Sequence, residues 1–179
     1  MILISAGHHA KKPGACYEGF CEFDEAEKWA DLVVQHLGDK SARVPSGYLR
    51  DKVEFINSRN PTIAIEIHFN SAVADGKNIG EGCEVLHYPS SKVGIILAEV
   101  ILESLEMVFP PSRGIKEGWY RMDQSKGVDF FLERTKCPSV IVEPQFIHLK
   151  ENIQNRRAEA CLKMADAIED FLELVEIKK

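Results

Sequence analysis

Three short apolar segments each end next to a side chain that can bind a metal ion or move a proton. The first opens the chain and is followed by His8, the second is residues 63–67 and is followed by His68, and the third is residues 140–142 and is followed by Glu143. Apolar runs of this length, rich in isoleucine and valine, are typical of buried strands. Because ligands bind at the carboxyl ends of strands in open α/β sheets, the three ends are predicted to meet at one site.

Longer segments between these strands carry apolar residues at helical spacing. They are predicted to be helices over residues 24–37, 48–56, 91–108 and 152–175. Helices that alternate with buried strands predict an α/β fold with a mostly parallel, twisted sheet and helices on both faces. A chain of 179 residues with no repeat or linker is predicted to form a single domain over residues 1–179.

The remaining segments have weaker patterns. Asp24 and Glu27 have the spacing of a capping box, which predicts that the first helix begins there, and Gly38 is a typical end. Proline and glycine predict loops or irregular structure elsewhere. The predicted irregular segments are 8–21, 70–82 and 113–127, and the further short strands are 43–44, 83–87 and 130–132.

Charge and hydrophobicity exclude several classes of function. Lys and Arg number 22 against 28 Asp and Glu, a net charge of −6, which argues against nucleic acid as the main partner because phosphate binding needs a basic face. No run approaches the roughly 18–20 apolar residues of a membrane span, so membrane insertion is not expected. The first apolar run is also shorter than the apolar core of about 7–15 residues in a secretory signal. We therefore expect synthesis in a cytoplasm without an export signal; the oligomeric state is not readable.

The five cysteines are odd in number and contain no Cys-x-x-Cys pair. In a reducing cytoplasm they are expected to be free and mostly buried thiols. They are Cys16, Cys21, Cys83, Cys137 and Cys161.

A metal ion would explain why three buried strands end on polar side chains. Catalytic zinc takes three protein ligands from histidine and carboxylate and keeps a fourth position open, so two histidines and one glutamate suit it, with a further carboxylate as general base. The alternative is that these histidines are hydrogen-bonded structural residues. Other side chains compete for any role, and Glu66, on the strand face of His68, is either a hydrogen-bonding partner of that histidine or a charge near an edge. The other competitors are His9, His36, His87 and His148.

Six short motifs follow one another along nearly the whole chain. They are Gly-His at 7–8, Pro-Gly-Ala at 13–15 with Gly-x-x-Glu at 19–22, Ile-His-x-Asn at 67–70, Gly-x-Glu-Val at 82–85, Arg-Gly-x-Lys at 113–116, and Pro-x-Val-x-Val-Glu at 138–143. In this order the chain resembles the zinc-dependent N-acetylmuramoyl-L-alanine amidases of the amidase-3 type, which include catalytic domains of phage endolysins.

The resemblance implies a role for four side chains. His8, Glu22 and His68 correspond to the ligands of one zinc ion per chain, and Glu143 corresponds to the catalytic carboxylate. The family register selects His8 over His9 because the ligand directly follows the glycine. It also selects Glu22, which spacing alone does not single out.

Substrate contacts are predicted at three further positions. Asn70 and Gln145 lie close in sequence to the predicted site, and Trp119 belongs to residues 118–128, which look like an insertion relative to the family. The pair 144–145 also departs from the family, in which an apolar residue and a glycine follow the catalytic glutamate. The wall of the cleft is therefore expected to differ here.

The resemblance implies hydrolysis of peptidoglycan at the amide between N-acetylmuramic acid and L-alanine. Many endolysins of this kind also carry a cell-wall-binding domain. None is recognised in residues 1–179, so we expect either a catalytic fragment or an enzyme that works without one. A phage endolysin that reaches the wall through a holin pore fits the expected absence of an export signal. The alternatives are a bacterial autolysin-type amidase, another zinc peptidase or deacetylase on the same site, and a metal-free wall-binding module.

Overall fold

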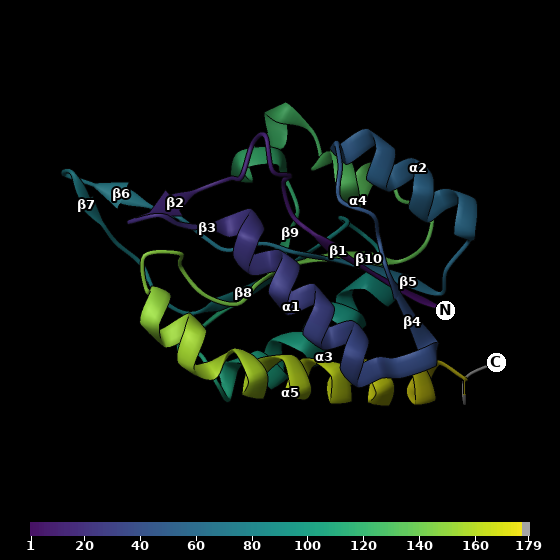
Figure 1. The fold of residues 1–179 in the computed structure, drawn as a ribbon. Coiled ribbons are helices and arrows are strands. Elements are labelled where there is room, and N and C mark those ends of the chain that lie inside the picture. The colour runs from purple at the N-terminus through teal and green to yellow at the C-terminus, as the bar shows by residue number, and fades with distance from the viewer. Residues whose placement is uncertain (177–179) are drawn as a thin grey trace.

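Six strands form the central sheet, in the order β4-β1-β5-β10-β8-β9, in the computed structural model (Figure 1). The structure describes residues 1–176. The elements in chain order are β1 (Ile2–Ala6), β2 (Cys16–Tyr17), β3 (Phe20–Cys21), α1 (Glu22–Leu37), η1 (Gly38–Lys40), β4 (Ser41–Arg43), α2 (Leu49–Arg59), β5 (Ile63–Ile67), β6 (Val73–Ala74), β7 (Lys77–Asn78), β8 (Cys83–His87), α3 (Lys92–Glu106), β9 (Ser112–Glu117), η2 (Tyr120–Met122), η3 (Gln124–Lys126), α4 (Phe130–Arg134), β10 (Ser139–Glu143) and α5 (Lys150–Glu176).

Four strands of the sheet run in one direction, which confirms the mostly parallel α/β fold. β4, β1, β5 and β10 are parallel neighbours. β8 is antiparallel to β10, and β9 runs parallel to β8 at the edge. The carboxyl ends of β1, β5 and β10 therefore lie next to one another, as expected from the three apolar segments.

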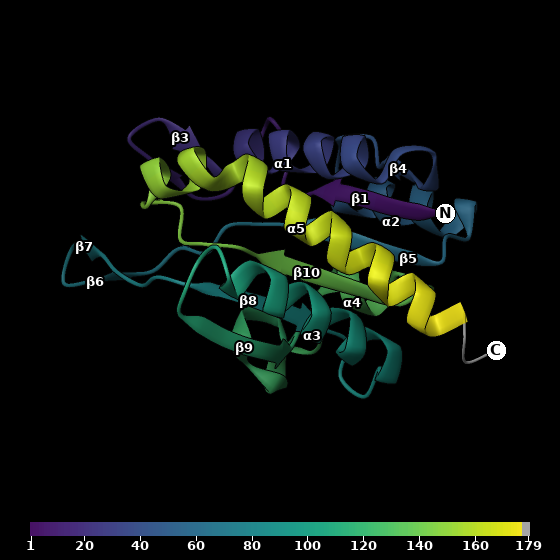
Figure 2. The same cartoon turned by 90° about the horizontal axis from the view of Figure 1, so that it is seen from below.

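Helices cover both faces of the sheet, as predicted. α1, α3 and α5 pack on one face, and α2 and α4 lie on the other (Figures 1 and 2). The alternation along β5 decides which side chain faces which layer: Ile63, Ile65 and Ile67 join the core under the three long helices, while Ala64 faces α2. Glu66 and His68 therefore emerge on the face of the two shorter helices. No helix within residues 1–176 is both long and apolar enough to cross a membrane.

Two predictions about the segment 112–134 are wrong. Residues 112–117 form the edge strand β9 rather than irregular structure, because a polar strand that pairs on one side only has no apolar pattern. Residues 130–132 belong to the helix α4 rather than to a strand. Asp129 caps this helix by accepting a hydrogen bond from the backbone N–H of Phe131, a local signal that outweighs the apolar triplet.

The predicted loops at 8–21 and 70–82 each contain a short two-stranded hairpin, β2-β3 and β6-β7. The capping box at Asp24 is also wrong, since α1 begins at Glu22 and no side chain caps it. Its first N–H groups instead donate to carbonyls of the preceding loop, from Glu22 to Ala15 and from Phe23 to Pro13. This backbone cap places Glu22 in the first turn of the helix.

Candidate metal and active site

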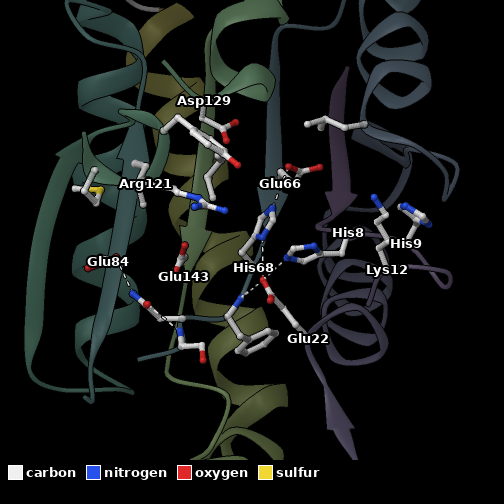
Figure 3. Close-up of a pocket in the computed structure, with 18 of the residues that line it drawn as sticks. His8, His9, Lys12, Glu22, Glu66, His68, Glu84, Arg121, Asp129 and Glu143 are labelled. Atoms are coloured by element: carbon white, nitrogen blue, oxygen red, sulfur yellow. Dashed lines mark hydrogen bonds and ion pairs between the residues drawn. The ribbon is translucent and has the colours of Figure 1, made fainter. Parts of the chain in front are cut away.

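The structure brings His8, Glu22 and His68 together at the carboxyl edge of the sheet (Figure 3). The first follows β1, the second opens α1 and the third follows β5. His8 Nε2 lies 3.0 Å and His68 Nδ1 lies 2.9 Å from Glu22 Oε1. Three donor atoms from separate segments within 4.8 Å of one another form a candidate metal site.

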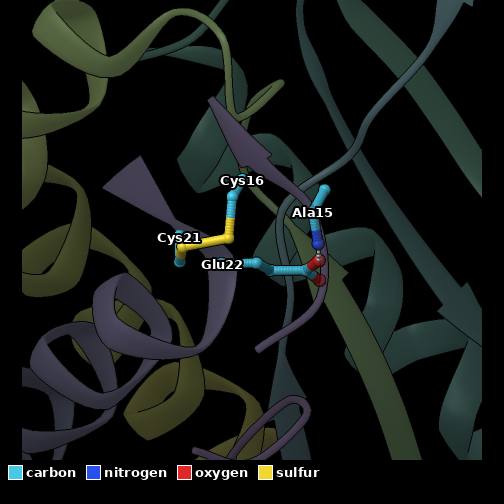
Figure 4. Close-up of a disulfide and its surroundings, with 4 residues drawn as sticks. All are labelled: Ala15, Cys16, Cys21 and Glu22. Carbon is cyan, nitrogen blue, oxygen red and sulfur yellow. Dashed lines mark hydrogen bonds between the residues drawn. A yellow bond between two sulfur atoms is a disulfide. The ribbon is translucent and has the colours of Figure 1, made fainter. Parts of the chain in front are cut away.

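A hairpin carries Glu22 into this position. Cys16 and Cys21 face each other across β2 and β3 and are joined by a disulfide (Figure 4), so the prediction that all five cysteines are free is wrong for this pair. Their Cα atoms are 4.1 Å apart because the hairpin folds back within four residues. Beside the disulfide, the backbone N–H of Ala15 donates to Glu22 Oε2 at 3.0 Å. The free cysteines are Cys83, Cys137 and Cys161.

Two glycines leave room for the histidine rings. A Cβ atom at Gly7 would lie 2.5 Å from the ring of His68. A Cβ at Gly14 would lie 2.4 Å from Glu22 Oε2 and 2.5 Å from the ring of His8. The glycines of the Gly-His and Pro-Gly-Ala motifs therefore allow the backbone to approach the candidate ligands closely.

The charges of the three side chains favour a bound cation. Burial raises the pKa of Glu22, but hydrogen bonds and charges of His68 and His8 outweigh this and bring the pKa well below its usual range. Burial lowers the pKa of His68, but Glu22 and Glu66 raise it well above the ordinary value. A metal cation bound between these groups would balance the negative charge of the Glu22 carboxylate, and the histidines would then be neutral.

The donor set also fits a metal ion geometrically. Tetrahedral coordination at ~2.0–2.1 Å requires donor atoms about 3.3 Å from one another. The two separations to Glu22 Oε1 are 2.9 and 3.0 Å, and all three donor atoms lie within 4.8 Å of one another. Two imidazoles and one carboxylate leave a fourth position free. His9 is not part of the triangle, because its ring packs against Tyr48 with centroids 4.7 Å apart.

Glu143 lies at the end of β10 and lines the same cavity of about 620 Å³ as the three candidate ligands. Burial raises the pKa of its carboxyl to about 7, with further contributions from the charges of Glu84 and Glu22, against the lowering effects of His68 and Lys116. A carboxyl with a pKa near neutrality can both accept and return a proton.

Glu84 lies directly opposite Glu143 in the antiparallel pair of β8 and β10. Like charges in this position repel, and the structure compensates on the Glu84 side. Arg113 Nε donates to its carboxylate at 2.7 Å, Lys116 Nζ pairs with it, and Asn70 Nδ2 donates at 2.7 Å. Glu84 is therefore the member of the pair that has cationic partners, and Glu143 is the member whose pKa rises.

The three predicted substrate contacts have different surroundings. Asn70 and Trp119 line the cavity, although Asn70 also donates to Glu84 and Trp119 Nε1 donates to Glu117 at 2.9 Å. Gln145 is buried and is not among the residues that line the cavity. Its side-chain oxygen accepts hydrogen bonds from the backbone N–H groups of Gly82 and Phe146. This placement favours a structural task for Gln145.

Sequence reasoning missed Lys52, which is buried beneath the cavity and pairs with Glu66 at 2.7 Å. The signal was present, because Leu49, Lys52, Val53 and Ile56 fall at the spacing of one apolar helix face. A lysine on that stripe next to a buried strand glutamate indicates a buried ion pair. The hydrogen-bonding alternative for Glu66 is confirmed by the 3.1 Å contact between its Oε2 and His68 Nε2.

A family model described as N-acetylmuramoyl-L-alanine amidase matches residues 2–173. The chain belongs to this amidase-3 family. The match spans all of the candidate site residues, and the family's activity is hydrolysis of a peptidoglycan amide. A search of curated proteins found no match.

Solved structures of amidases share the fold of this amidase-3 chain. The N-acetylmuramoyl-L-alanine amidase from Clostridium difficile 630 is 16% identical with a TM-score of 0.79, and the match covers 96% of each chain. The amidase from Nostoc punctiforme is 22% identical with a TM-score of 0.79, again over 96% of each chain. The catalytic domain of an endolysin targeting Clostridia difficile is 21% identical with a TM-score of 0.73, over 94% of this chain and 96% of that one. At these identities the likeness concerns the fold.

Proposed function

We propose that this chain is a zinc-dependent N-acetylmuramoyl-L-alanine amidase that cleaves the amide between the lactyl group of N-acetylmuramic acid and L-alanine. The observation that carries the proposal is the triangle of His8, Glu22 and His68 in one cavity with Glu143. One zinc ion per chain suits two imidazoles and one carboxylate with a free fourth position. Held by His8, Glu22 and His68, zinc would supply Lewis-acid chemistry towards the scissile carbonyl and would lower the pKa of water.

Glu143 acts as general base and then as general acid in this proposal. Its carboxylate takes the proton of the attacking water, and the protonated carboxyl passes it to the departing amine of L-alanine. The pKa of about 7 suits both steps because neither proton transfer is strongly uphill at neutral pH. Glu84, neutralised by its own cations, keeps the neighbouring charge constant while Glu143 cycles.

Metal analysis combined with product analysis on purified peptidoglycan tests this function. The expected result is about one zinc per chain, new L-alanine amino termini and intact glycan strands in the mass spectrum of the digest. Cleavage inside the stem peptide would identify a peptidase, and release of acetate would identify a deacetylase. Protein without metal that binds the wall and releases nothing would identify a binding module.

The activity is expected to fall as the pH is lowered through and below about 7. Glu143 must be ionised to accept a proton, and its pKa is raised from 4.5 to about 7, so its basic form is lost as the pH falls below that value. A bound dication lowers the midpoint somewhat because it favours the carboxylate. A profile of kcat/KM from pH 5 to 9 with saturating zinc checks this; a constant value across the range would contradict the assignment of the base.

Residues 118–128 form the wall of the cavity opposite His8. Tyr120, Arg121 and Met122 line it, and both Arg121 and Met122 have left-handed backbone with φ of 53° and 57°. Figure 3 shows Arg121 directed into the cavity near Glu143. Within residues 1–176 this guanidinium forms no ion pair, and its Cζ lies 5.5 Å from the centroid of the Tyr120 ring. We propose that Arg121 binds a carboxylate of the stem peptide.

Replacing Arg121 by alanine is therefore expected to raise KM for muropeptides about 10-fold or more, with kcat changed far less, because the lost contact forms in the bound substrate as well as in the transition state. Arg121→Lys keeps the positive charge, and its KM is expected to lie between those of the wild type and Arg121→Ala. The comparison uses stem peptides with free and amidated carboxyl groups. An equal effect of Arg121→Ala on both substrates would refute the proposed contact.

We also propose that the enzyme serves as a phage endolysin that reaches the wall after release through a holin pore. The fold is shared with an endolysin catalytic domain and equally with bacterial amidases, so a biological assay must separate them. Production in a bacterial cytoplasm is expected to lyse the cells only when a holin is produced too. Lysis or wall turnover without a holin would favour an autolysin-type role.

A further inference from the structure

The ammonium group of Lys52 lies in the floor of the candidate metal site. Lys52 belongs to α2, and its side chain is only 2% exposed. Nζ donates to Ala6 O at 2.6 Å, to Glu66 Oε1 at 2.7 Å and to His8 O at 3.3 Å. These contacts use all three ammonium hydrogens, so the group has no capacity left for substrate or solvent.

Through Glu66, this ammonium reaches the ring of His68. Glu66 Oε1 accepts from Lys52 and, at 3.1 Å, from Ser5 Oγ, while Oε2 lies 3.1 Å from His68 Nε2. An ionised carboxylate can only accept, so in the metal-free structure His68 donates to Glu66 from Nε2 and to Glu22 from Nδ1. A cation held beside Glu22 would replace the proton on Nδ1, which lies 2.9 Å from Glu22 Oε1, while Glu66 would keep the proton on Nε2.

Through its backbone contacts, Lys52 also reaches His8. His8 has a left-handed backbone with φ of 60°, a conformation that residues other than glycine seldom adopt. The two carbonyls that Lys52 binds, Ala6 O and His8 O, lie on either side of Gly7 and bracket this turn. One buried cation therefore contacts the backbone of one candidate ligand and the hydrogen-bonding partner of the other.

We propose that Lys52 is a positioning residue for metal binding. With Glu66 it holds His8 and His68 at the spacing of the donor triangle and makes Nδ1 the ligand atom of His68. This inference rests on the proposed metal site but assigns a role that the ligand set does not include. A purely structural ion pair would stabilise the fold and leave the affinity for metal unchanged, which separates the two readings.

The test compares Lys52→Met with a matched variant at a second buried ion pair, which does not line the cavity. Arg157 donates to Glu25 at 2.9 Å, Glu25 is fully buried, and the pair lies between α5 and α1, away from the cavity. Zinc affinity is measured by competition with a chromophoric chelator, and the visible spectrum of the Co²⁺ form reports ligand geometry. Thermal unfolding of the metal-free proteins reports stability.

Lys52→Met is expected to weaken zinc binding about 10- to 100-fold and to change the Co²⁺ spectrum, as for other partners of metal ligands. Arg157→Met is expected to lower the unfolding temperature and leave zinc affinity within about twofold of the wild type. Equal zinc affinities of Lys52→Met and the wild type would overturn the proposal. A wild-type protein that binds no zinc would instead overturn the proposed function.

A second variant covers the case in which Lys52→Met does not fold because Glu66 is left buried without its cation. Lys52→Met combined with Glu66→Gln removes both charges and keeps the shape of the pair. This protein is expected to fold and still to bind zinc at least about 10-fold more weakly than the wild type. Nitrogen-15 NMR of the zinc-loaded wild type should show His68 bound through Nδ1 with a proton on Nε2. Ligation through Nε2, or wild-type affinity in the double variant, would refute the role of Lys52.

Discussion

Replacing Glu143 by glutamine is expected to reduce peptidoglycan hydrolysis by about a thousandfold, because an amide cannot accept the proton of the attacking water. Zinc content should remain at the wild-type level, since Glu143 lies outside the donor triangle. Release of L-alanine amino termini and elemental analysis of the same preparation provide the two measurements. A Glu143→Gln or Glu143→Ala variant that keeps more than a few percent of the activity would show that another group is the base.

The same variant is expected to stabilise the metal-free protein at alkaline pH. Folding raises the pKa of Glu143 from 4.5 to about 7, so the stability that this carboxyl contributes is fully present below pH 4.5 and is lost as the pH rises through 7. The loss amounts to at most about 3 kcal/mol of unfolding free energy above pH 7. Glu143→Gln removes this loss of stability at alkaline pH, because a glutamine side chain stays neutral.

Glu84→Gln is the matched control for this stability effect. Glu84 is buried in the same strand pair, but it is held by Arg113 and Lys116, which lose their partner in the variant. We expect Glu84→Gln to lower the unfolding temperature at pH 8 and Glu143→Gln to raise it. If both substitutions shift the unfolding temperature in the same direction, the distinction between a cation-paired Glu84 and an unpaired Glu143 is wrong.

Removal of the metal ion is expected to abolish hydrolysis, and added zinc should restore it. Each of the variants His8→Ala, Glu22→Ala and His68→Ala should behave like chelator-treated protein, because two remaining donors bind zinc far more weakly than three. His9→Ala is the control, since His9 lines the cavity and packs on Tyr48 without joining the donors. Full activity in excess chelator would exclude the metal mechanism.

Zinc should also stabilise the protein. A ligand that binds only the folded state at a hundred times its dissociation constant adds about 2.7 kcal/mol to the free energy of unfolding. Thermal unfolding with and without zinc is therefore expected to show a rise in the unfolding temperature for the wild type and His9→Ala. The three ligand variants should show little or none. Such a pattern would locate the ion independently of any activity assay.

The local pattern of the chain is sufficient for three adjacent strands of the sheet and for part of the site. Buried β-branched runs identify β1, β5 and β10, and their alternation assigns Ile63, Ile65 and Ile67 to the core and His68 to the open face. Parallel strands place their carboxyl ends at one edge, so the convergence of His8, His68 and Glu143 follows from pattern alone. Glu22 could be found only by its place in a family motif, since a glutamate near a helix start is common.

Contacts that apolar periodicity does not report decided the rest. The Cys16–Cys21 disulfide depends on the register of a hairpin with two-residue strands, and α4 depends on one capping hydrogen bond that Asp129 accepts from the backbone N–H of Phe131. The charge states of the site depend on partners that lie far away in sequence, such as Arg113 for Glu84 and Lys52 for Glu66. The apolar periodicity of a sequence indicates which residues are buried, but it does not indicate which side chains become neighbours. The ligand atom of His68 and the proton on Glu143 depend on low-dielectric neighbours that only the folded chain brings within hydrogen-bonding distance.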